Sequence, residues 1–185
     1  MKKLRSPLTA IIALMYLLSC SKSKPASGSN ANDFYLRFKA NGTQLEYRAH
    51  VEAIYNKQSG ADYITTLGGT KDQFIPTKSN MTVALTSVGV NQTNITYTNY
   101  ATAAAGFKKA KILQLGFYDA NGKFFMSWSD DFVSLLPAGT PINGRLILTE
   151  ATSSTLKGNF SGTMVTQDYQ SKVDITEGEF YLKLR

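Results

Sequence analysis

Apolar and polar positions alternate in short segments along most of the chain, which is the pattern of half-buried β-strands. Asn-Gly and other glycine-rich turns separate these segments, and no segment after residue 32 sustains an apolar stripe with the period of an α-helix. The pattern predicts an all-β fold. We expect an antiparallel β-sandwich or a partly open β-barrel of about eight to ten strands built from hairpins.

The first predicted hairpin turns at Asn41-Gly42. A two-residue type I′ turn at this dipeptide would pair apolar residues on one face of the hairpin and polar residues on the other, where Arg37 lies opposite Glu46. The predicted pairs on the apolar face are Leu36 with Tyr47 and Phe38 with Leu45. The same inward parity continues as far as Tyr55, which predicts one long strand after the turn.

The second predicted hairpin turns at Asn121-Gly122. A two-residue turn here predicts these pairs: Phe117 with Met126, Leu115 with Trp128, and Tyr118 with Phe125. Because both faces then carry aromatic side chains, the strand pair is either buried on both sides, the favoured interpretation, or presents an aromatic face to a ligand or partner. The candidate contact residues are Trp128, Tyr118 and Phe125.

Further strands are predicted at residues 63–67, 81–90, 94–100, 145–149, 156–166 and 173–184. The last of them changes phase, because Val173 and Phe180 have opposite parity although both are apolar. A β-bulge near Glu177-Gly178 would restore a common buried face. Glycines 158 and 162 share the parity of their large apolar neighbours, so we expect facing side chains to fill the space above them. Gly68-Gly69 is interpreted as a turn between strands.

The first 19 residues form a predicted signal peptide. Lys2, Lys3 and Arg5 precede an apolar run at 8–18, which is shorter than the roughly 20 residues that span a bilayer. The run ends in Leu-Leu-Ser-Cys, which resembles the lipobox of bacterial lipoproteins. That resemblance implies cleavage before Cys20, diacylation of its thiol (palmitate being a typical chain) and acylation of the freed amine. Two or three acyl chains anchor a protein stably to a membrane that it does not span.

The rest of the chain divides into a tether and a domain. Residues 20–32 comprise the cysteine and a stretch of small, polar and basic residues that cannot form a core. Residues 33–185 are the length of a single β domain. Ser21 stands where an aspartate would resemble an inner-membrane retention signal, so we expect a lipid-anchored protein of the cell envelope at the outer membrane, with the leaflet left open.

Charge and reactive residues narrow the function. Of the formal net charge of +7, three units belong to the signal peptide, which leaves about +4 on the remainder and gives no reason to expect a nucleic-acid partner. The single histidine, His50, is expected on a solvent-facing strand position, and one His with one Cys cannot complete a zinc site. Asp130 and Asp131 would point to opposite faces of a strand. We therefore expect no catalytic residues, no metal and no cofactor.

Three short motifs carry a resemblance. "FKANG" at 38–42, "FSGTM" at 160–164 and "TEGEF" at 176–180 resemble a group of small uncharacterised β-sheet lipoproteins of Gram-negative bacteria. The resemblance implies the β fold and the lipid-anchored address, and it assigns no binding or catalytic residue.

The function expected from the sequence is a non-catalytic binding module for a small molecule, a glycan or a protein of the envelope. The alternative is a structural or assembly subunit of an outer-membrane complex. An enzyme that uses an unrecognised carboxylate or tyrosine site is a third hypothesis.

Overall fold

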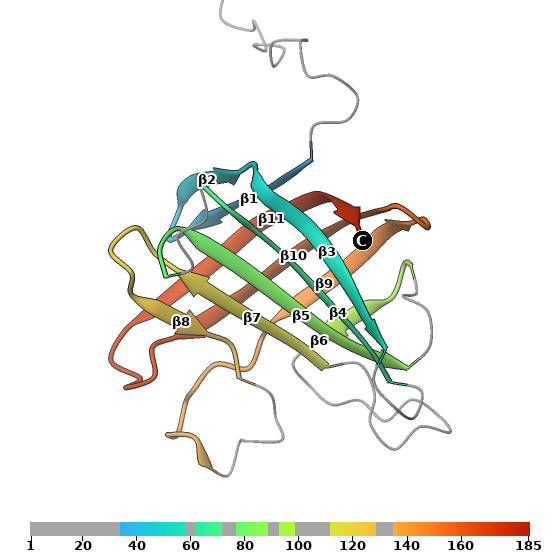
Figure 1. Ribbon diagram of the computed structural model, residues 1–185. Coiled ribbons are helices and arrows are strands. Elements are labelled where there is room, and N and C mark those ends of the chain that lie inside the picture. The colour runs from blue at the N-terminus through green and yellow to red at the C-terminus, as the bar shows by residue number, and fades with distance from the viewer. Residues whose placement is uncertain (1–33, 58–61, 72–76, 89–92, 99–111, 129–134) are drawn as a thin grey trace, which may run out of the picture. The chain divides into compact units, whose positions relative to one another are not determined.

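The computed structural model describes residues 34–57, 62–71, 77–88, 93–98, 112–128 and 135–185. Within them the chain is all-β, as predicted, with eleven strands in one mixed sheet (Figure 1). The strands are β1 (Tyr35–Ala40), β2 (Thr43–Tyr47), β3 (Ala49–Lys57), β4 (Asp62–Thr70), β5 (Asn80–Val88), β6 (Thr96–Thr98), β7 (Ile112–Tyr118), β8 (Phe124–Met126), β9 (Arg145–Ala151), β10 (Thr155–Val165) and β11 (Lys172–Leu184). The predicted signal peptide, Cys20 and the tether lie outside the described residues.

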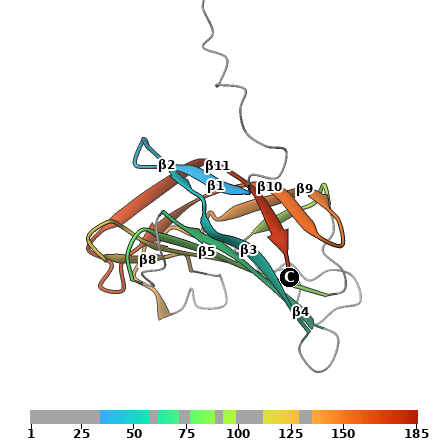
Figure 2. The same ribbon diagram turned by 45° about the horizontal axis from the view of Figure 1, so that its top comes forward.

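The sheet is strongly curved, so that strands far apart in the sequence meet across one core (Figure 2). Its order is β2-β1-β11-β3-β4-β5-β7-β6-β9-β10-β8, with additional pairings of β11 with β10 and of β7 with β8. Most pairs are antiparallel, and β3–β11 and β6–β7 are parallel. The architecture is sandwich-like or partly barrel-like. The core contains the buried face of these strands, including Phe38, Tyr47, Leu115, Phe160 and Phe180.

The first hairpin has the predicted register. Phe38 faces Leu45, and Arg37 faces Glu46. Asn41 and Gly42 have φ angles of 48° and 80°, the left-handed conformation that a type I′ turn requires at both central residues.

The prediction of one long strand after this turn is wrong. The chain breaks at Arg48, so β2 ends at Tyr47 and β3 begins at Ala49. His50 has a φ of 51°, and the pairing of β3 with β4 shifts register between Ala49 and Glu52. At this irregularity the chain leaves β1, the neighbour of β2, and β3 pairs instead with β4 and β11. The one predicted strand is therefore two, and the described residues contain eleven strands where about eight to ten were predicted.

The predicted register of the second hairpin is also wrong, by one residue. Phe117 faces Phe125, and Tyr118 faces Phe124. Asp119 is the cause, because its Oδ1 accepts hydrogen bonds from the backbone N–H of Asn121 and of Lys123, each at 2.8 Å. The loop therefore has three residues and only Gly122 is left-handed, with a φ of 85°. The one-residue shift exchanges the faces of Phe124 and Phe125.

The predicted bulge in the last strand is confirmed. Phe160 pairs with Gly178 but Gly162 pairs with Ile175, so β11 carries an extra residue, and Glu177 there has a φ of 50°. Ile175 and Phe180 consequently share the core. The predicted filling of the glycine gaps is also confirmed: a Cβ on Gly158 would lie 2.6 Å from Phe180 Cζ, and one on Gly162 would lie 3.1 Å from Leu115 Cδ1.

Gly68-Gly69 is not a turn. Both residues lie inside β4 and pair with Thr82 and Met81 of β5. A Cβ on Gly68 would come within 2.7 Å of the Met81 carbonyl oxygen, so close strand packing requires the glycine.

Candidate functional site

The three aromatic residues selected from the sequence lie in different environments. Phe125 is only 7% exposed and stacks in the core on Phe117, with ring centroids 6.1 Å apart, so it is not available at the surface. Trp128 is half-buried and stacks on Tyr169 at 6.0 Å. Tyr118 is half-buried on the outer face of β7, and its ring lies 4.6 Å from that of Phe124. Tyr118 and Phe124 therefore form an aromatic pair at the surface.

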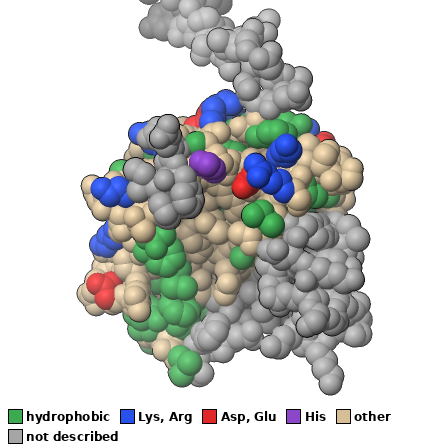
Figure 3. All heavy atoms as spheres, viewed as in Figure 1, with side chains coloured by type: hydrophobic (Ala, Val, Ile, Leu, Met, Phe, Trp, Pro, Cys, Tyr) green, Lys and Arg blue, Asp and Glu red, His purple; other side chains and the backbone are tan. Residues whose placement is uncertain are grey.

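This pair lines a shallow hollow of about 290 Å³ on the outer face of β5, β7 and β8. Its apolar lining comes from Ala84, Gly116 and Met126 together with the two aromatic rings. Hydrophobic side chains gather over β7 and β8 on the face that Figure 3 shows. The small residues Ala84 and Gly116 keep the surface low between the larger side chains, which produces the concave shape.

The Phe124 ring lies over Gly116 of β7. A Cβ at Gly116 would be 3.4 Å from Phe124 Cε2 and 3.6 Å from its Cζ, so the ring packs against the backbone of β7. Phe124 remains 37% exposed in this position. The ring thus lies on the surface of β7 with part of it accessible, which is the geometry of a stacking platform.

Few polar groups surround this hollow. Gln114 and Thr82 are exposed at its margin, whereas the Ser127 hydroxyl is already hydrogen-bonded to the backbone N–H of Leu115 at 2.7 Å. The lining contains no histidine, cysteine or carboxylate. The arrangement is suited to holding an apolar or ring-shaped group with one or two hydrogen bonds, and it contains no nucleophile-and-base pair.

A second, more polar hollow of about 460 Å³ shares Phe124. It is lined by Lys123, Thr166, Gln167 and Asp168 besides the ring. The Thr166 hydroxyl donates to Asp168 Oδ1 at 2.5 Å, and this bond, followed by that from the Gln170 N–H, lowers the pKa of the Asp168 carboxyl. Phe124 thus separates an apolar hollow from a polar one.

The other titratable candidates are placed as follows. His50 is exposed on β3, as predicted. Asp119 caps the loop between β7 and β8 through its backbone contacts. Asp130 and Asp131 lie outside the described residues. Within the part of the chain that the structure describes, no group of three His, Cys, Asp or Glu side chains is arranged to hold a metal, and no helix has the length and apolarity to cross a bilayer.

Phe124 is the surface residue that the sequence reasoning missed. The signal that would have found it is Asp119 two residues before Asn121, because an Asp at that position favours a three-residue loop over a two-residue turn.

No protein-family model matches this chain, and a search of curated proteins finds no match either.

Proposed function

We propose that this protein is a lipid-anchored envelope protein whose β domain is a non-catalytic binding module, with its ligand site at the Tyr118–Phe124 hollow. The observation that carries the proposal is the exposed Phe124 ring, held against Gly116 beside a concave apolar surface. Fixed aromatic side chains bind at low entropic cost, because few rotamers are lost on association. The ligand expected at such a site is a small molecule or glycan that offers an apolar face to the ring.

The proposed address rests on the first 32 residues. Their positive start, apolar run and Leu-Leu-Ser-Cys ending support cleavage and lipidation at Cys20, followed by a tether that gives the domain reach. The test is fractionation with labelled palmitate in the producing bacterium. Wild-type protein is expected in the outer-membrane fraction and labelled, and Cys20→Ala protein is expected to be unlabelled and released from the membrane. A labelled Cys20→Ala protein contradicts the proposed anchor.

The proposed binding site is tested with the purified full chain and ligand-observed NMR, using a panel of neutral oligosaccharides and amphiphilic small molecules. Compounds that bind are expected to lose contact with Phe124→Ala and Tyr118→Ala. Leu135→Ala is the matched control, since Leu135 is 78% exposed and lines neither hollow that Phe124 borders. Binding that survives both aromatic substitutions places the ligand elsewhere, and a panel without any binder removes the support for this function.

The alternative, an assembly subunit, is favoured by one feature: β2 is an end strand of the sheet order. However, the Glu46–Arg48 ion pair at 2.6 Å places charge on this strand and its continuation, which disfavours edge-to-edge pairing. Affinity purification from detergent-solubilised membranes separates the two functions, because stoichiometric protein partners are expected only for the subunit.

A further inference from the structure

A polar groove of about 440 Å³ crosses β9, β10 and β11, on strands other than those of the Phe124 hollow. Arg145 and Ile147 of β9 form one side, Asn159 and Ser161 of β10 lie in the middle, and Glu177 and Glu179 of β11 form the other side. The strand register aligns them in two rows. Arg145 faces Ser161 in one row, and in the other Asn159 faces Ile147 on one side and Glu179 on the other.

The bulge in β11 gives the groove part of its chemistry. Thr176 and Glu177 are consecutive and both exposed, which a regular strand does not allow, because its successive side chains alternate between faces. The extra residue opposite Ser161 therefore adds a polar side chain to the outer face at the groove.

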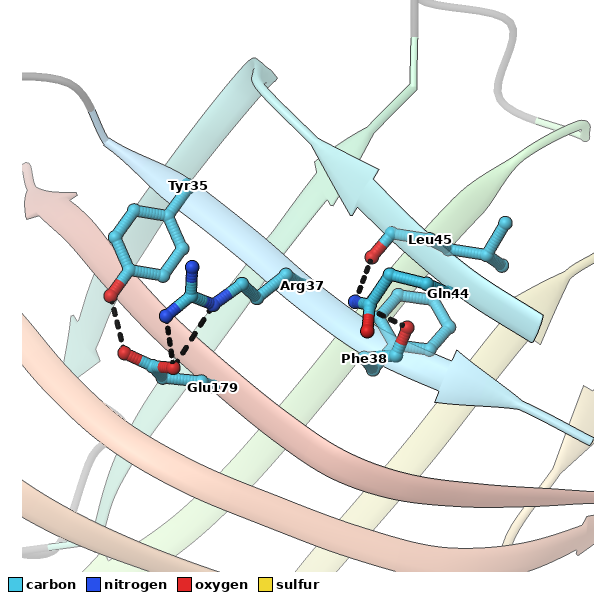
Figure 4. A network of polar contacts seen from close by, with 6 residues as sticks. All are labelled: Tyr35, Arg37, Phe38, Gln44, Leu45 and Glu179. Carbon is cyan, nitrogen blue, oxygen red and sulfur yellow. Dashed lines mark hydrogen bonds and ion pairs between the residues drawn. The ribbon is translucent and has the colours of Figure 1, made fainter. Parts of the chain in front are cut away.

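The acidic side of the groove is already neutralised by β1. Figure 4 shows Tyr35 and Arg37 of β1 reaching across to Glu179. The Tyr35 hydroxyl donates to Oε1 at 2.5 Å, and Arg37 Nη2 donates to Oε2 at 2.6 Å, so both carboxylate oxygens are engaged. Lys39 Nζ likewise contacts Glu177 Oε1 at 2.6 Å. An incoming cation would have to compete with these three groups.

The basic side is different. Arg145 is exposed and forms no ion pair with any residue that the structure describes. The side chains of Asn159 and Ser161 likewise have no hydrogen bond to another described residue. Among the described residues, the groove thus combines a guanidinium without an ion-pair partner with an amide and a hydroxyl whose side chains form no hydrogen bond.

These groups specify a ligand chemistry. A guanidinium binds a carboxylate through two parallel hydrogen bonds. A doubly charged phosphate would meet Glu177 and Glu179 in the same groove, where Arg145 is the one lining cation without an ion-pair partner among the described residues. Because both glutamates are already paired with groups of β1, the ligand needs no ammonium group to neutralise them. Neutral hydroxyls of a ligand can form hydrogen bonds with the side chains of Asn159 and Ser161. We propose that this groove binds a carboxylate-bearing sugar, with the carboxylate on Arg145 and ring hydroxyls on Asn159 and Ser161.

The test uses the purified full chain and two probes, D-galacturonate and polygalacturonate, which distinguish a free acidic sugar from a polysaccharide as its source. Chemical-shift titration is expected to give a dissociation constant on the order of 1 mM for at least one probe. The methyl ester of galacturonate, which lacks the charge, is expected not to bind. The proposal is overturned if neither probe binds, or if the methyl ester binds as tightly as the free acid.

Three variants locate the binding. Arg145→Gln is expected to weaken it by about tenfold or more, and Arg145→Lys is expected to weaken it less, because a lysine keeps the charge but loses the planar fork. Lys172→Gln removes the same charge from another exposed position and is expected to leave binding unchanged. Thermal melts establish that each variant is folded. Unchanged binding in Arg145→Gln, or equal weakening in Lys172→Gln, contradicts the assignment of the carboxylate to Arg145.

Discussion

Gly178 of β11 lies opposite Phe160 of β10, and the absence of a side chain at the glycine makes room for the phenylalanine ring. A Cβ on Gly178 would come 2.7 Å from Phe160 Cδ1 and would also collide with the Phe160 carbonyl oxygen. Phe160 in turn packs near Phe38 and Phe180, with ring centroids 6.0 and 6.3 Å away. The pair therefore joins the bulged strand to the aromatic part of the core.

Gly178→Ala is expected to lower the free energy of unfolding by about 1–3 kcal/mol, the usual cost of overpacking a core. Urea denaturation of the purified protein measures it. Phe160→Leu in the same chain is expected to relieve part of this cost, since it removes ring atoms from the collision. The control is Gly42→Ala, which has open space around its Cβ and is destabilised only through its φ of 80°. If the double variant loses as much free energy of unfolding as the two single variants together, the two changes are independent and the steric explanation is contradicted.

Asp119→Ala is expected to destabilise the β7–β8 hairpin, because the backbone N–H groups of Asn121 and Lys123 both lose their acceptor. The expected cost is about 1.5–3 kcal/mol, the usual contribution of hydrogen bonds to a charged group. Asp119→Asn keeps an acceptor oxygen and is expected to cost less. Hydrogen exchange of the two amides reports the effect locally. Equal exchange rates in wild type and Asp119→Ala would show that the carboxylate does not hold the loop.

The sequence predicted those features of the fold that follow from local rules. Asn41-Gly42 fixes the first register because both residues tolerate left-handed φ angles, and the phase change between Val173 and Phe180 could be corrected only by an extra residue. The break at Arg48 was not predictable in the same way. Alternation continues through it without a change of parity, and the departure of β3 depends on pairing with β11, which lies more than 100 residues later in the chain.

The candidate site was predicted only in part, and the reason is local. The sequence places Tyr118 and Phe125 on one face of the hairpin and favours burial of both faces, and this register rests on the Asn-Gly dipeptide alone. The Asp119 side chain competes for the same backbone groups and lengthens the loop by one residue, and a shift of one residue exchanges the two faces of a strand. Phe125 was consequently predicted where Phe124 is found.

Stability is expected to depend on pH through Tyr35 and Glu179. Burial and the hydrogen bond to Glu179 raise the pKa of Tyr35 from 10.0 to about 12. The folded state therefore favours the protonated phenol, so this contribution is fully present below pH 10 and is lost as the pH rises toward 12. Melting temperature measured across this range is expected to fall less steeply in Tyr35→Phe than in wild type. Tyr181→Phe serves as the control, and an equal change in its slope would argue against Tyr35 as the source.

Glu179 acts at the other end of the pH range. Burial alone would raise the pKa of its carboxyl, but hydrogen bonds from Tyr35 and Arg37 outweigh burial and lower it. A carboxyl with a lowered folded-state pKa stabilises the fold above its unfolded pKa of about 4.3, and this contribution disappears as the pH falls. Glu179→Gln is therefore expected to weaken the acid dependence of the melting temperature. Glu150→Gln, which breaks the exposed Lys157–Glu150 pair, is the matched control, and the proposed network predicts a smaller effect for it.

Phe124 and Phe125 are adjacent, yet their substitution is expected to have opposite consequences for stability and binding. Phe125→Ala empties a core position beside Phe117 and is expected to cost about 3–5 kcal/mol of unfolding free energy. Phe124→Ala removes a ring that is already 37% exposed, so its stability cost is expected to be clearly smaller, while ligand binding at the hollow is lost. Denaturation curves and ligand titration of both variants measure the contrast. If Phe124→Ala is instead the more destabilising of the two, Phe124 is the core residue and Phe125 the surface residue, as a two-residue turn at Asn121-Gly122 would require. That result would contradict both the three-residue loop and the proposed binding site at Phe124.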